Sequence, residues 1–484
     1  MQFGVIQRIL GLLLSLFSLT MLLPLLMACF NKDNSSFIVF LTAMTVTLVL
    51  GLVLWLPVRN NRKELKLRDG FVIVVLFWAG LGLTGTIPLV LSDSYPMSFA
   101  DAAFESISAL TTTGATVIIG IDTLPQSILL YRQLLQWLGG MGIIVLAVAI
   151  LPMLGVGGMQ LYRAETPGPT KDTKLTPRIT ETAKALWYIY LSLTVACAIS
   201  YWLAGMVFFD AIAHSFSTVS IGGFSTHDSS IGYFNNKTIN AIAVVFMLLS
   251  GINFTLHFIA WRSLKLGVYW KDSELKAYLC VLLGICVICC SYLIYQGVYE
   301  QPSVAIAHGI FQTISISTTT GFTTANYQSW PNFLPVLLIF ASFMGACAGS
   351  TGGGLKVVRI VLLFKQGLRE IRRLVHPSAI ISIKLGDKPV QESIINAIWG
   401  FFAFYVSVFA IIMLLLMATG LNQVTAFSAT AACINNLGPG LGDVGAHYGN
   451  INDVAKWLLC LAMLLGRLEI FTLLVLLSPT FWRK

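Results

Sequence analysis

Long apolar segments separated by short polar ones run through the whole chain. A helix needs about 20 apolar residues to cross the ~30 Å hydrocarbon core of a bilayer, and ten segments reach that length. The pattern therefore predicts an all-α polytopic membrane protein. The predicted spans lie near residues 5–30, 36–57, 70–92, 128–153, 183–209, 238–263, 275–299, 331–365, 391–419 and 452–478.

Composition supports a membrane protein and excludes several other classes. Of 484 residues, 56% are hydrophobic and 11% are charged, whereas a soluble domain carries about 25% charged residues. This number of charges cannot cover the surface of a water-facing globule of this size. The composition therefore excludes a cytosolic enzyme, a nucleic-acid binder and a disulfide-stapled secreted module. The nine Cys lie almost wholly in apolar stretches. The C-x-x-C of Cys286 and Cys289 has no His or second pair nearby, which favours buried hydrophobic Cys over a zinc site.

The basic residues fall mainly on one side of the predicted membrane. Of 30 Lys and Arg, 25 lie in four connecting segments or near the chain ends. By the positive-inside rule, these segments and both termini face the cytoplasm. The opposite side carries an excess of carboxylates, which concentrates cations; we count Glu105 and the basic Arg132 on this outer side. The four basic segments are 59–69, 163–184, 262–276 and 356–388.

One motif recurs four times, each time in an outer connection between two spans. Residues 101–116, 210–225, 308–323 and 425–440 are rich in Ser, Thr and Ala and contain a Gly near their end. Aligned without gaps on that Gly, all four copies carry a small hydroxyl residue or Ala six and eight positions earlier. A repeat of this period predicts a quasi-symmetric array of span–loop–span units.

The residues before each motif Gly predict a short helix that enters the membrane and stops halfway. About 12 residues rise only ~18 Å, which is too little to cross. The chain then returns as extended backbone, which is tolerated at this depth only inside protein or beside water. Gly permits dihedrals that turn backbone carbonyls toward a common axis. The C-terminal ends of the short helices direct their partial negative charge toward the same axis. Four such loops therefore predict a cation filter. Its predicted residues are Thr111, Thr112, Thr113, Gly114, Ser220, Ile221, Gly222, Gly223, Thr318, Thr319, Thr320, Gly321, Asn435, Asn436, Leu437 and Gly438.

The filter loops and several further stretches resemble the Trk/Ktr/HKT superfamily of potassium transporters. The similar stretches are LLQWLGGMGIIVLAVAILP at 134–152, GVGGMQLYRAE at 155–165, GACAGSTGGGLK at 345–356, NNLGPGLG at 435–442 and GRLEIFTLLVL at 466–476. The resemblance runs nearly end to end. It implies two additional N-terminal helices, then four pseudo-symmetric M1–re-entrant pore loop–M2 units around a central pore. The implied segments are 1–69 for the N-terminal pair and 70–182, 183–274, 275–390 and 391–484 for the four pore units.

The resemblance also implies an ion and partners. In the family, Gly in the filter loop accompanies potassium preference, whereas Ser in the first loop of some plant members accompanies sodium; all four positions are Gly here. Loops two and four depart from Thr-Thr-Thr-Gly, which breaks the four-fold symmetry. Implied partners are a second copy in a homodimer, with one pore per protomer, and a TrkA-like cytosolic nucleotide-binding subunit that docks on the basic inner loops. We expect surrounding membrane lipid, no nucleic acid and no nucleotide bound by this chain.

The eighth predicted span contains a Gly-rich interruption. Five Gly in ten residues cannot form a stable helix, since each costs about 1 kcal/mol against Ala. Close helix packing through small residues is one interpretation, and a phosphate-binding loop fits worse because no strand precedes it. We favour a movable intramembrane gate below the filter, partly because the family has that feature here. Its predicted residues are Gly345, Gly349, Gly352, Gly353, Gly354 and Lys356.

Arg467 lies 15 residues into the last predicted span. A charge at that depth costs at least about 2.5–3.5 kcal/mol, so we expect it to face the pore cavity as part of the gate. The alternative is that Arg467 snorkels or bonds to loop carbonyls. Glu469 cannot pair with it by helix spacing. For His214 and His308, near the pore-helix starts, packing or hydrogen bonding is favoured over metal binding.

Together these patterns predict potassium uptake across a bacterial inner membrane, through a carbonyl-lined filter gated by the intramembrane loop. Two other classes stay open. A potassium/proton symporter of the alternating-access type would need a membrane carboxylate that titrates with transport, for which Glu469 is the candidate. A non-ionic solute carrier with inverted repeats is disfavoured, because the repeats here run in the same direction.

Overall fold

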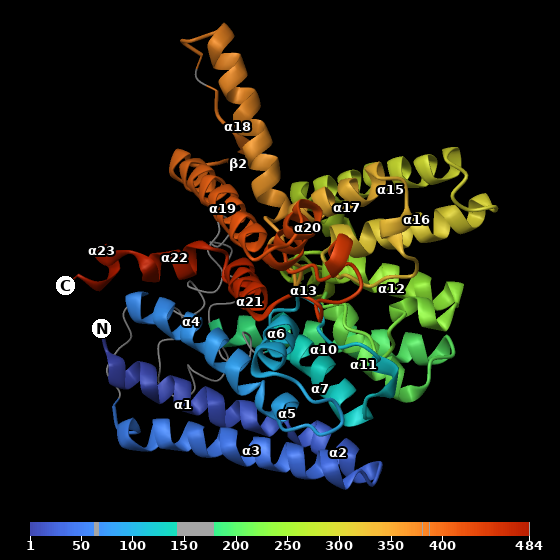
Figure 1. Ribbon diagram of the computed structural model, residues 1–484. Coiled ribbons are helices and arrows are strands. Elements are labelled where there is room, and N and C mark those ends of the chain that lie inside the picture. Colours follow the sequence, from blue (N-terminus) through green and yellow to red (C-terminus); the bar gives the residue numbers. More distant parts are fainter. Residues whose placement is uncertain (62–66, 143–178, 380, 387, 484) are drawn as a thin grey trace.

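The computed structural model describes most of the chain, and nearly all of its regular structure is helical (Figure 1). The similar stretch at 155–165, with its Gly-rich turn, lies outside the described residues, as does most of the basic segment 163–184. The described residues are 1–61, 67–142, 179–379, 381–386 and 388–483.

Apolar helices form the predicted N-terminal pair. The first span consists of α1 (Phe3–Thr20) and α2 (Leu22–Phe30), and the second of α3 (Asn34–Trp55) with the short η1 (Leu56–Val58). In Figure 1, α1 and α3 run side by side. They approach closely because Gly11 and Gly51 lie at the crossing.

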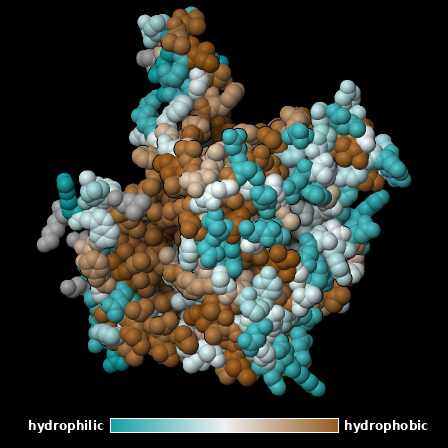
Figure 2. All heavy atoms as spheres, in the orientation of Figure 1, coloured by the Kyte–Doolittle hydropathy of each residue, from teal (hydrophilic) through white to brown (hydrophobic). Residues whose placement is uncertain are grey.

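Each pore unit begins with a long apolar helix, as predicted. With the N-terminal pair, these give six helices in the described residues that are long and apolar enough to cross a membrane. Figure 2 shows broad apolar areas on the surface of the body, which fit contact with lipid tails. The first spans of the units are α4 (Leu67–Thr84), which is followed by the short α5 (Ile87–Val90), then α10 (Ile179–Leu203), α15 (Ser273–Tyr295) and α19 (Glu392–Ala418).

Each unit continues with a short, largely buried helix, as predicted for re-entrant pore helices. Their lengths are 12, 12, 16 and 12 residues, too short to cross the membrane. The side chains of Ser98 and Asn422 cap the first and fourth by accepting a hydrogen bond from the backbone N–H three residues later. The four pore helices are α6 (Phe99–Leu110), α11 (Phe208–Val219), α16 (Pro302–Ser317) and α20 (Gln423–Ile434).

The second helix is interrupted in units two, three and four, whereas the sequence predicted an interruption only in unit three; in unit one the predicted span 128–153 lies outside the described residues beyond Gly142. The expectation of continuous helices over 238–263 and 452–478 is wrong: the chain bends by 93° after Ser250, and Glu469 and Ile470 adopt positive φ angles of 53° and 47°. In unit one, an α-helix passes into a π-helical turn. The elements are α7 (Gln126–Trp137) with η3 (Leu138–Gly142), α12 (Lys237–Ser250) with α13 (Phe254–Ser263), α17 (Phe333–Met344) with α18 (Val357–Val375), and α21 (Asp453–Arg467) with α22 (Phe471–Leu477).

Short elements complete the described structure. Both chain ends lie on the same side of the body in Figure 1, while α18 projects away from it. A two-stranded antiparallel hairpin follows α18 and is too small to alter the all-α class. The short elements are η2 (Ile121–Thr123), η4 (Ser230–Phe234), α14 (Gly267–Lys271), η5 (Tyr327–Ser329), β1 (Lys384–Leu385), β2 (Lys388–Pro389), η6 (Gly442–Val444) and α23 (Pro479–Trp482).

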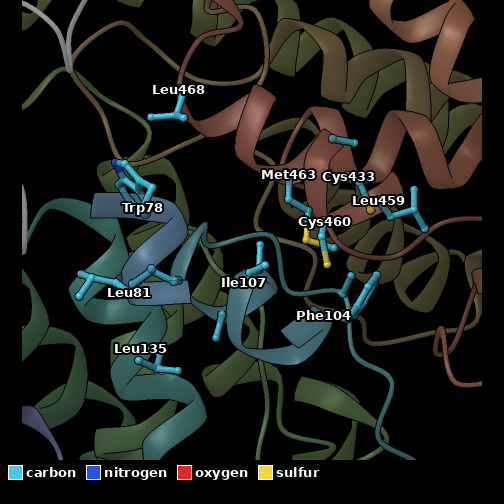
Figure 3. Close-up of a cluster of buried hydrophobic side chains, with 14 of the residues drawn as sticks. Trp78, Leu81, Phe104, Ile107, Leu135, Cys433, Leu459, Cys460, Met463 and Leu468 are labelled. Atoms are coloured by element: carbon cyan, nitrogen blue, oxygen red, sulfur yellow. The ribbon is translucent and has the colours of Figure 1, made fainter. Parts of the chain in front are cut away.

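The largest buried cluster joins the first and last pore units. Figure 3 shows Phe104 and Ile107 of α6 near Cys460 and Met463 of α21, with Trp78 of α4 on the opposite side. These side chains are nearly fully buried. Units from opposite ends of the chain therefore pack as neighbours, which a closed arrangement of four units requires.

We expect Gly51→Ala to lower thermal stability. The added Cβ would lie 2.4 Å from Ser15 Oγ and 2.7 Å from the Ser15 backbone nitrogen, so α1 and α3 must separate. Overpacking of this kind costs about 1–3 kcal/mol. Thermal unfolding in detergent measures the change. Gly284→Ala in α15 is the matched control, because its Cβ meets no atom within 4 Å; equal melting temperatures for the two variants would contradict the prediction.

Candidate ion-conducting site

The four pore helices end in one backbone motif. In each, the N–H of the residue before the motif Gly donates to the carbonyl five residues earlier, at 2.7–2.9 Å. This is a Schellman-type ending, whose left-handed position is usually Gly. Here it is never Gly, and three of the four residues are β-branched, so the surroundings must hold this backbone in place. The left-handed residues, with φ of 54–68°, are Thr112, Ile221, Thr319 and Asn436.

Each motif Gly contacts the next loop, and the four contacts close a ring in chain order. These Gly have φ of 77–98°. A Cβ on Gly114 would lie 2.1 Å from the carbonyl oxygen of Gly222 in loop two. Any other residue would push neighbouring loops apart, so all four positions require Gly. An added Cβ at the other three positions would lie similarly close: 2.0 Å from the Thr320 oxygen at Gly223, 2.2 Å from the Leu437 oxygen at Gly321 and 2.6 Å from the Thr113 oxygen at Gly438.

The structure brings the sixteen predicted filter residues together in this ring, which we call the filter ring. Loops one and three bond alike: the Oγ1 atoms of Thr111 and Thr113 lie 2.8 Å apart, as do those of Thr318 and Thr320. Loop four differs, because the Asn436 amide donates to the Thr113 hydroxyl at 3.0 Å. The departure of loop four from Thr-Thr-Thr-Gly thus adds a contact with loop one.

Side chains of α7 support loop two, which sequence reasoning missed. Gln136 donates to the Gly222 carbonyl at 2.6 Å and accepts from the Phe224 N–H at 3.1 Å. Gln133 donates to the Phe224 carbonyl at 3.4 Å. Two amides inside a predicted span were an available signal, since buried polar groups need partners.

The Gly-rich segment 345–356, here called the gate loop, lies against three of the four filter loops. The Thr351 hydroxyl donates to the Val219 carbonyl at 3.0 Å, at the end of pore helix two. The Gly353 N–H donates to the Thr319 hydroxyl at 2.8 Å. The Gly354 N–H donates to the Asn435 carbonyl in loop four at 3.1 Å. The loop therefore lies directly against the C-terminal ends of these pore helices.

Glu274, at the start of α15, holds the gate loop and was not predicted as a site residue. Its Oε1 accepts from the Ala348 N–H at 2.7 Å and from the Val358 N–H at 3.1 Å, which lie on either side of the Gly-rich core of the loop. Lys356 folds back to donate to the Gly352 carbonyl. Glu274 is nearly buried. The sequence placed it in the basic segment 262–276, one residue before the predicted span 275–299, so its position carried no clear signal.

Arg467 joins the gate loop to filter loop one. It donates to the Thr112 hydroxyl at 3.2 Å and to the Thr351 carbonyl at 3.4 Å. It also donates to the carbonyls of Gly139 and Gly140 in η3. Loop carbonyls thus hold this charge, as the alternative interpretation expected, and they place it directly beside the filter ring.

The helix-spacing argument for Glu469 does not apply, because α21 ends at Arg467. Glu469 lies in the break and pairs with Arg359 of α18, Oε2 to Nη2, at 2.5 Å. The guanidinium of Arg359 lies 4.4 Å from the ring centroid of Phe401. The break in the last span is therefore tied to the helix that follows the gate loop.

Glu105 and Arg132 do not lie on the outer surface, where the sequence placed them. Their side chains are 0% and 1% exposed and form an ion pair at 2.7 Å beside the filter ring. The signal was their position, since Glu105 is central in a pore helix and Arg132 lies inside the predicted span 128–153. A charge in an apolar helix needs a partner.

The two histidines form hydrogen bonds, as expected. His214 contacts the Asp210 carbonyl and Ser225 Oγ, both at 2.9 Å, and His308 contacts Thr324 Oγ1 at 3.0 Å. Within the described parts of the chain, no group of three or more His, Cys, Asp and Glu is arranged to hold a metal ion. All nine Cys are free thiols, most of them wholly or partly buried.

A charged cluster links loops one and two at their outer ends. His227 Nδ1 lies 2.5 Å from Asp122 Oδ1, and its Nε2 lies 3.5 Å from Asp210 Oδ2. Burial lowers the pKa of His227, but its hydrogen bonds to Asp210 and Asp122 outweigh this, and the pKa is raised above the ordinary 6.5. The pKa of Asp122 moves below its ordinary 3.8, because hydrogen bonds with His227 and Asp228 outweigh the opposing effect of burial.

Comparison with known proteins identifies the family. A family model described as "TrkH: Cation transport protein" matches residues 36–484. The chain belongs to the TrkH family. The resemblance to the Trk/Ktr/HKT superfamily is thereby confirmed.

TrkH family members with named functions align over nearly the whole chain. The Trk system potassium uptake protein TrkH of Vibrio parahaemolyticus is 59% identical over 486 residues, and that of Salmonella typhimurium is 56% identical over 484; both alignments cover 100% of each chain. TrkG of Escherichia coli K12 is 43% identical over 480 residues, covering 99% of each. These relatives are named as transport proteins, which confirms that this chain is not an enzyme.

A solved structure of the TrkH family has the same fold. The crystal structure of the potassium transporter TrkH from Vibrio parahaemolyticus matches with a TM-score of 0.91 and 56% identity, and the match covers 100% of both chains. The predicted fold class is thereby confirmed, with its N-terminal pair and four pore units.

We expect the stability contribution of His227 in this TrkH family member to depend on pH. Because the pKa of His227 is raised in the folded state, protonated His227 contributes its full stability below about pH 6.5, and this contribution is lost as pH rises through the folded-state pKa. The pKa of Asp122 is lowered, so its contribution is lost at low pH. Thermal unfolding should therefore show wild type to be more stable than His227→Asn mainly between about pH 4 and 6.5. The difference in free energy of unfolding should be less than about 1 kcal/mol, because the pair is partly exposed. His376→Asn, at an exposed site, is the control. A difference that does not vary with pH would contradict this.

Proposed function

We propose that this protein mediates potassium uptake across a bacterial inner membrane through the filter ring. The observation that carries the proposal is the ring itself: four loops in register, each with its motif Gly against a carbonyl of the next. Backbone carbonyls in such a ring can replace the water shell of a cation. The relatives named as potassium uptake proteins support potassium as the ion. Potassium is then the cargo, held at the sixteen filter residues.

The gate loop supports channel-like conduction under control of a movable segment. Its contacts with loops two, three and four, and with Arg467, fit a closed state. Opening would require these few hydrogen bonds to break without unfolding a helix. Arg467 adds a positive charge beside the filter ring, which opposes cation passage while the loop is in place.

A potassium/proton symporter is the less favoured alternative, because the buried and half-buried carboxylates found near the site are held by other groups. Glu105 is ion-paired, Glu274 accepts two backbone N–H groups and Glu469 is paired with Arg359. Recording single proteins in planar bilayers tests the choice. Discrete unitary currents support a channel, whereas transport that follows a proton gradient without such currents would overturn it.

We propose a homodimer in which α18 contacts a second copy. Phe364, Leu368, Ile371 and Val375 lie on one face of this projecting helix, and all four are exposed, the least by 39%. Their spacing of four, three and four residues is that of a coiled-coil seam.

The basic segments and both chain ends are assigned to the cytoplasm, where a TrkA-like nucleotide-binding subunit would dock.

We expect Gly114→Ser to weaken potassium-over-sodium selectivity while folding survives. The new Cβ would lie 2.1 Å from the Gly222 oxygen, so loops one and two must move apart. A roughly tenfold loss corresponds to about 1.4 kcal/mol of discrimination. Relative fluxes of the two ions in proteoliposomes measure it, with Gly80→Ser, which meets no atom within 4 Å, as the control. Unchanged relative flux would remove loop one from the filter.

We expect Arg467→Ala to raise basal potassium flux in the absence of the regulatory subunit. At about 8 Å and an effective dielectric near 20, a fixed charge repels a cation by ~2 kcal/mol, roughly thirtyfold in rate. Arg467→Lys keeps the charge but lacks the planar fork, so it should raise flux less. Flux and melting temperature are measured for both variants. Reduced flux in a thermally stable Ala variant would contradict the assignment of Arg467 to the gate.

A further inference from the structure

A buried ion pair lies beside filter loops one and two. Glu105 belongs to pore helix α6 and Arg132 to α7; Arg132 Nη2 lies 2.7 Å from Glu105 Oε1, and Nε donates to the same oxygen at 2.8 Å. Of the ion pairs formed between described residues, this is the most deeply buried. Desolvating two charges often costs as much as their attraction returns, so the pair is weak evidence of a purely stabilising role.

The pair holds two loops at once. Glu105 bonds to the residues two and three positions after the motif Gly of loop one, while Arg132 contacts the two residues that directly follow the motif Gly of loop two. These are the two loops joined by the contact between Gly114 and Gly222 in the filter ring. The contacts are Thr116 Oγ1 at 3.0 Å and Val117 N at 3.0 Å to Glu105, and the Ser225 carbonyl at 3.4 Å and the Phe224 ring centroid at 4.2 Å to Arg132.

The same position serves as a tether in other units, but with neutral groups. Glu105 is nine residues before its motif Gly, and the equivalent residues are His214, Gln312 and Ala429. His214 contacts Ser225 Oγ at 2.9 Å, and Gln312 accepts from the Thr324 N–H at 3.4 Å, both within their own loops. In unit one this position is therefore charged, and with Arg132 it connects two loops. In units two and three it is a neutral group that contacts only its own loop.

We propose that Glu105 and Arg132 are positioning residues that set potassium-over-sodium discrimination by fixing filter loops one and two relative to each other. This deepens the proposed function and rests on it. Discrimination by a carbonyl ring depends on the spacing and number of its dipoles. The planar guanidinium forms directed bonds to the carboxylate and to loop two together, which a flexible neutral group cannot reproduce.

The decisive variant is the double substitution Glu105→Gln/Arg132→Gln. It removes both charges, so no unpaired charge is buried, and it gives unit one the residue type that unit three has at the same position. Arg132→Lys is the second variant, since it keeps the charge and loses the fork. Glu392→Gln, which breaks an ion pair with Arg369 far from the filter, is the control.

Two readouts separate positioning from plain stabilisation. One is the ratio of potassium to sodium flux in proteoliposomes; the other is the difference in melting temperature between potassium and sodium buffers, because a bound ion stabilises the folded state. We expect the double variant to lose roughly tenfold in the flux ratio and most of the melting difference, as loss of a charge-assisted hydrogen bond at the filter implies. Arg132→Lys should fall between it and wild type, and Glu392→Gln should match wild type.

The outcomes distinguish this inference from the proposed function. If the variants melt earlier by the same amount in both buffers and keep the wild-type flux ratio, the pair is merely structural and the inference is overturned. If wild-type protein itself shows no difference between potassium and sodium in either readout, the proposed function is overturned instead. Should the double variant fail to fold, an unchanged flux ratio in Arg132→Lys alone overturns the inference.

Discussion

Backbone that leaves a helix inside a membrane finds no water, so each exposed N–H and carbonyl must meet another protein group. The four filter loops satisfy this constraint partly through their own pore helices, to which the N–H before each motif Gly donates, and partly through neighbours. Gln136 of α7 donates to the Gly222 carbonyl of loop two, and the Gly354 N–H of the gate loop donates to the Asn435 carbonyl of loop four. In loops one and three the neighbours bond to side chains, since Arg467 donates to the Thr112 hydroxyl and the Gly353 N–H donates to the Thr319 hydroxyl. The arrangement of the helices around the filter follows from where those partners must be.

The same constraint explains how strained backbone persists in the filter. A non-Gly residue in the left-handed region costs roughly 1–2 kcal/mol, and the ring holds four of them, including Ile221. Each lies one residue before the carbonyl that contacts the neighbouring Gly. Because every loop is confined by the next, no single loop can relax alone, and the ring behaves as one unit.

Much of this was predictable from the sequence, for reasons that particular residues make clear. Gly and small hydroxyl residues at fixed offsets indicated the pore helices, and five Gly in ten residues indicated the gate loop. The breaks at 251–253 and 468–470 carried no comparable signal, because a positive φ at Ile470 depends on tertiary contacts and not on residue type. The partnership of Glu105 with Arg132 was hidden for a similar reason. The two residues are 27 positions apart, on helices whose crossing the sequence does not specify.

The closure of the ring has a consequence for biosynthesis. Loop four meets loop one, and the contact is reinforced where the Tyr448 N–H donates to the Thr116 carbonyl at 2.7 Å and where Lys456 pairs with Asp101 at 2.6 Å. Domains fold as the chain leaves the ribosome, N-terminal parts first. Loop one, with its buried charges, therefore lacks its contact with loop four until nearly the whole polypeptide has been made and loop four has entered the membrane. The ring of four loops can therefore be complete only after loop four, near the end of the chain, has been made.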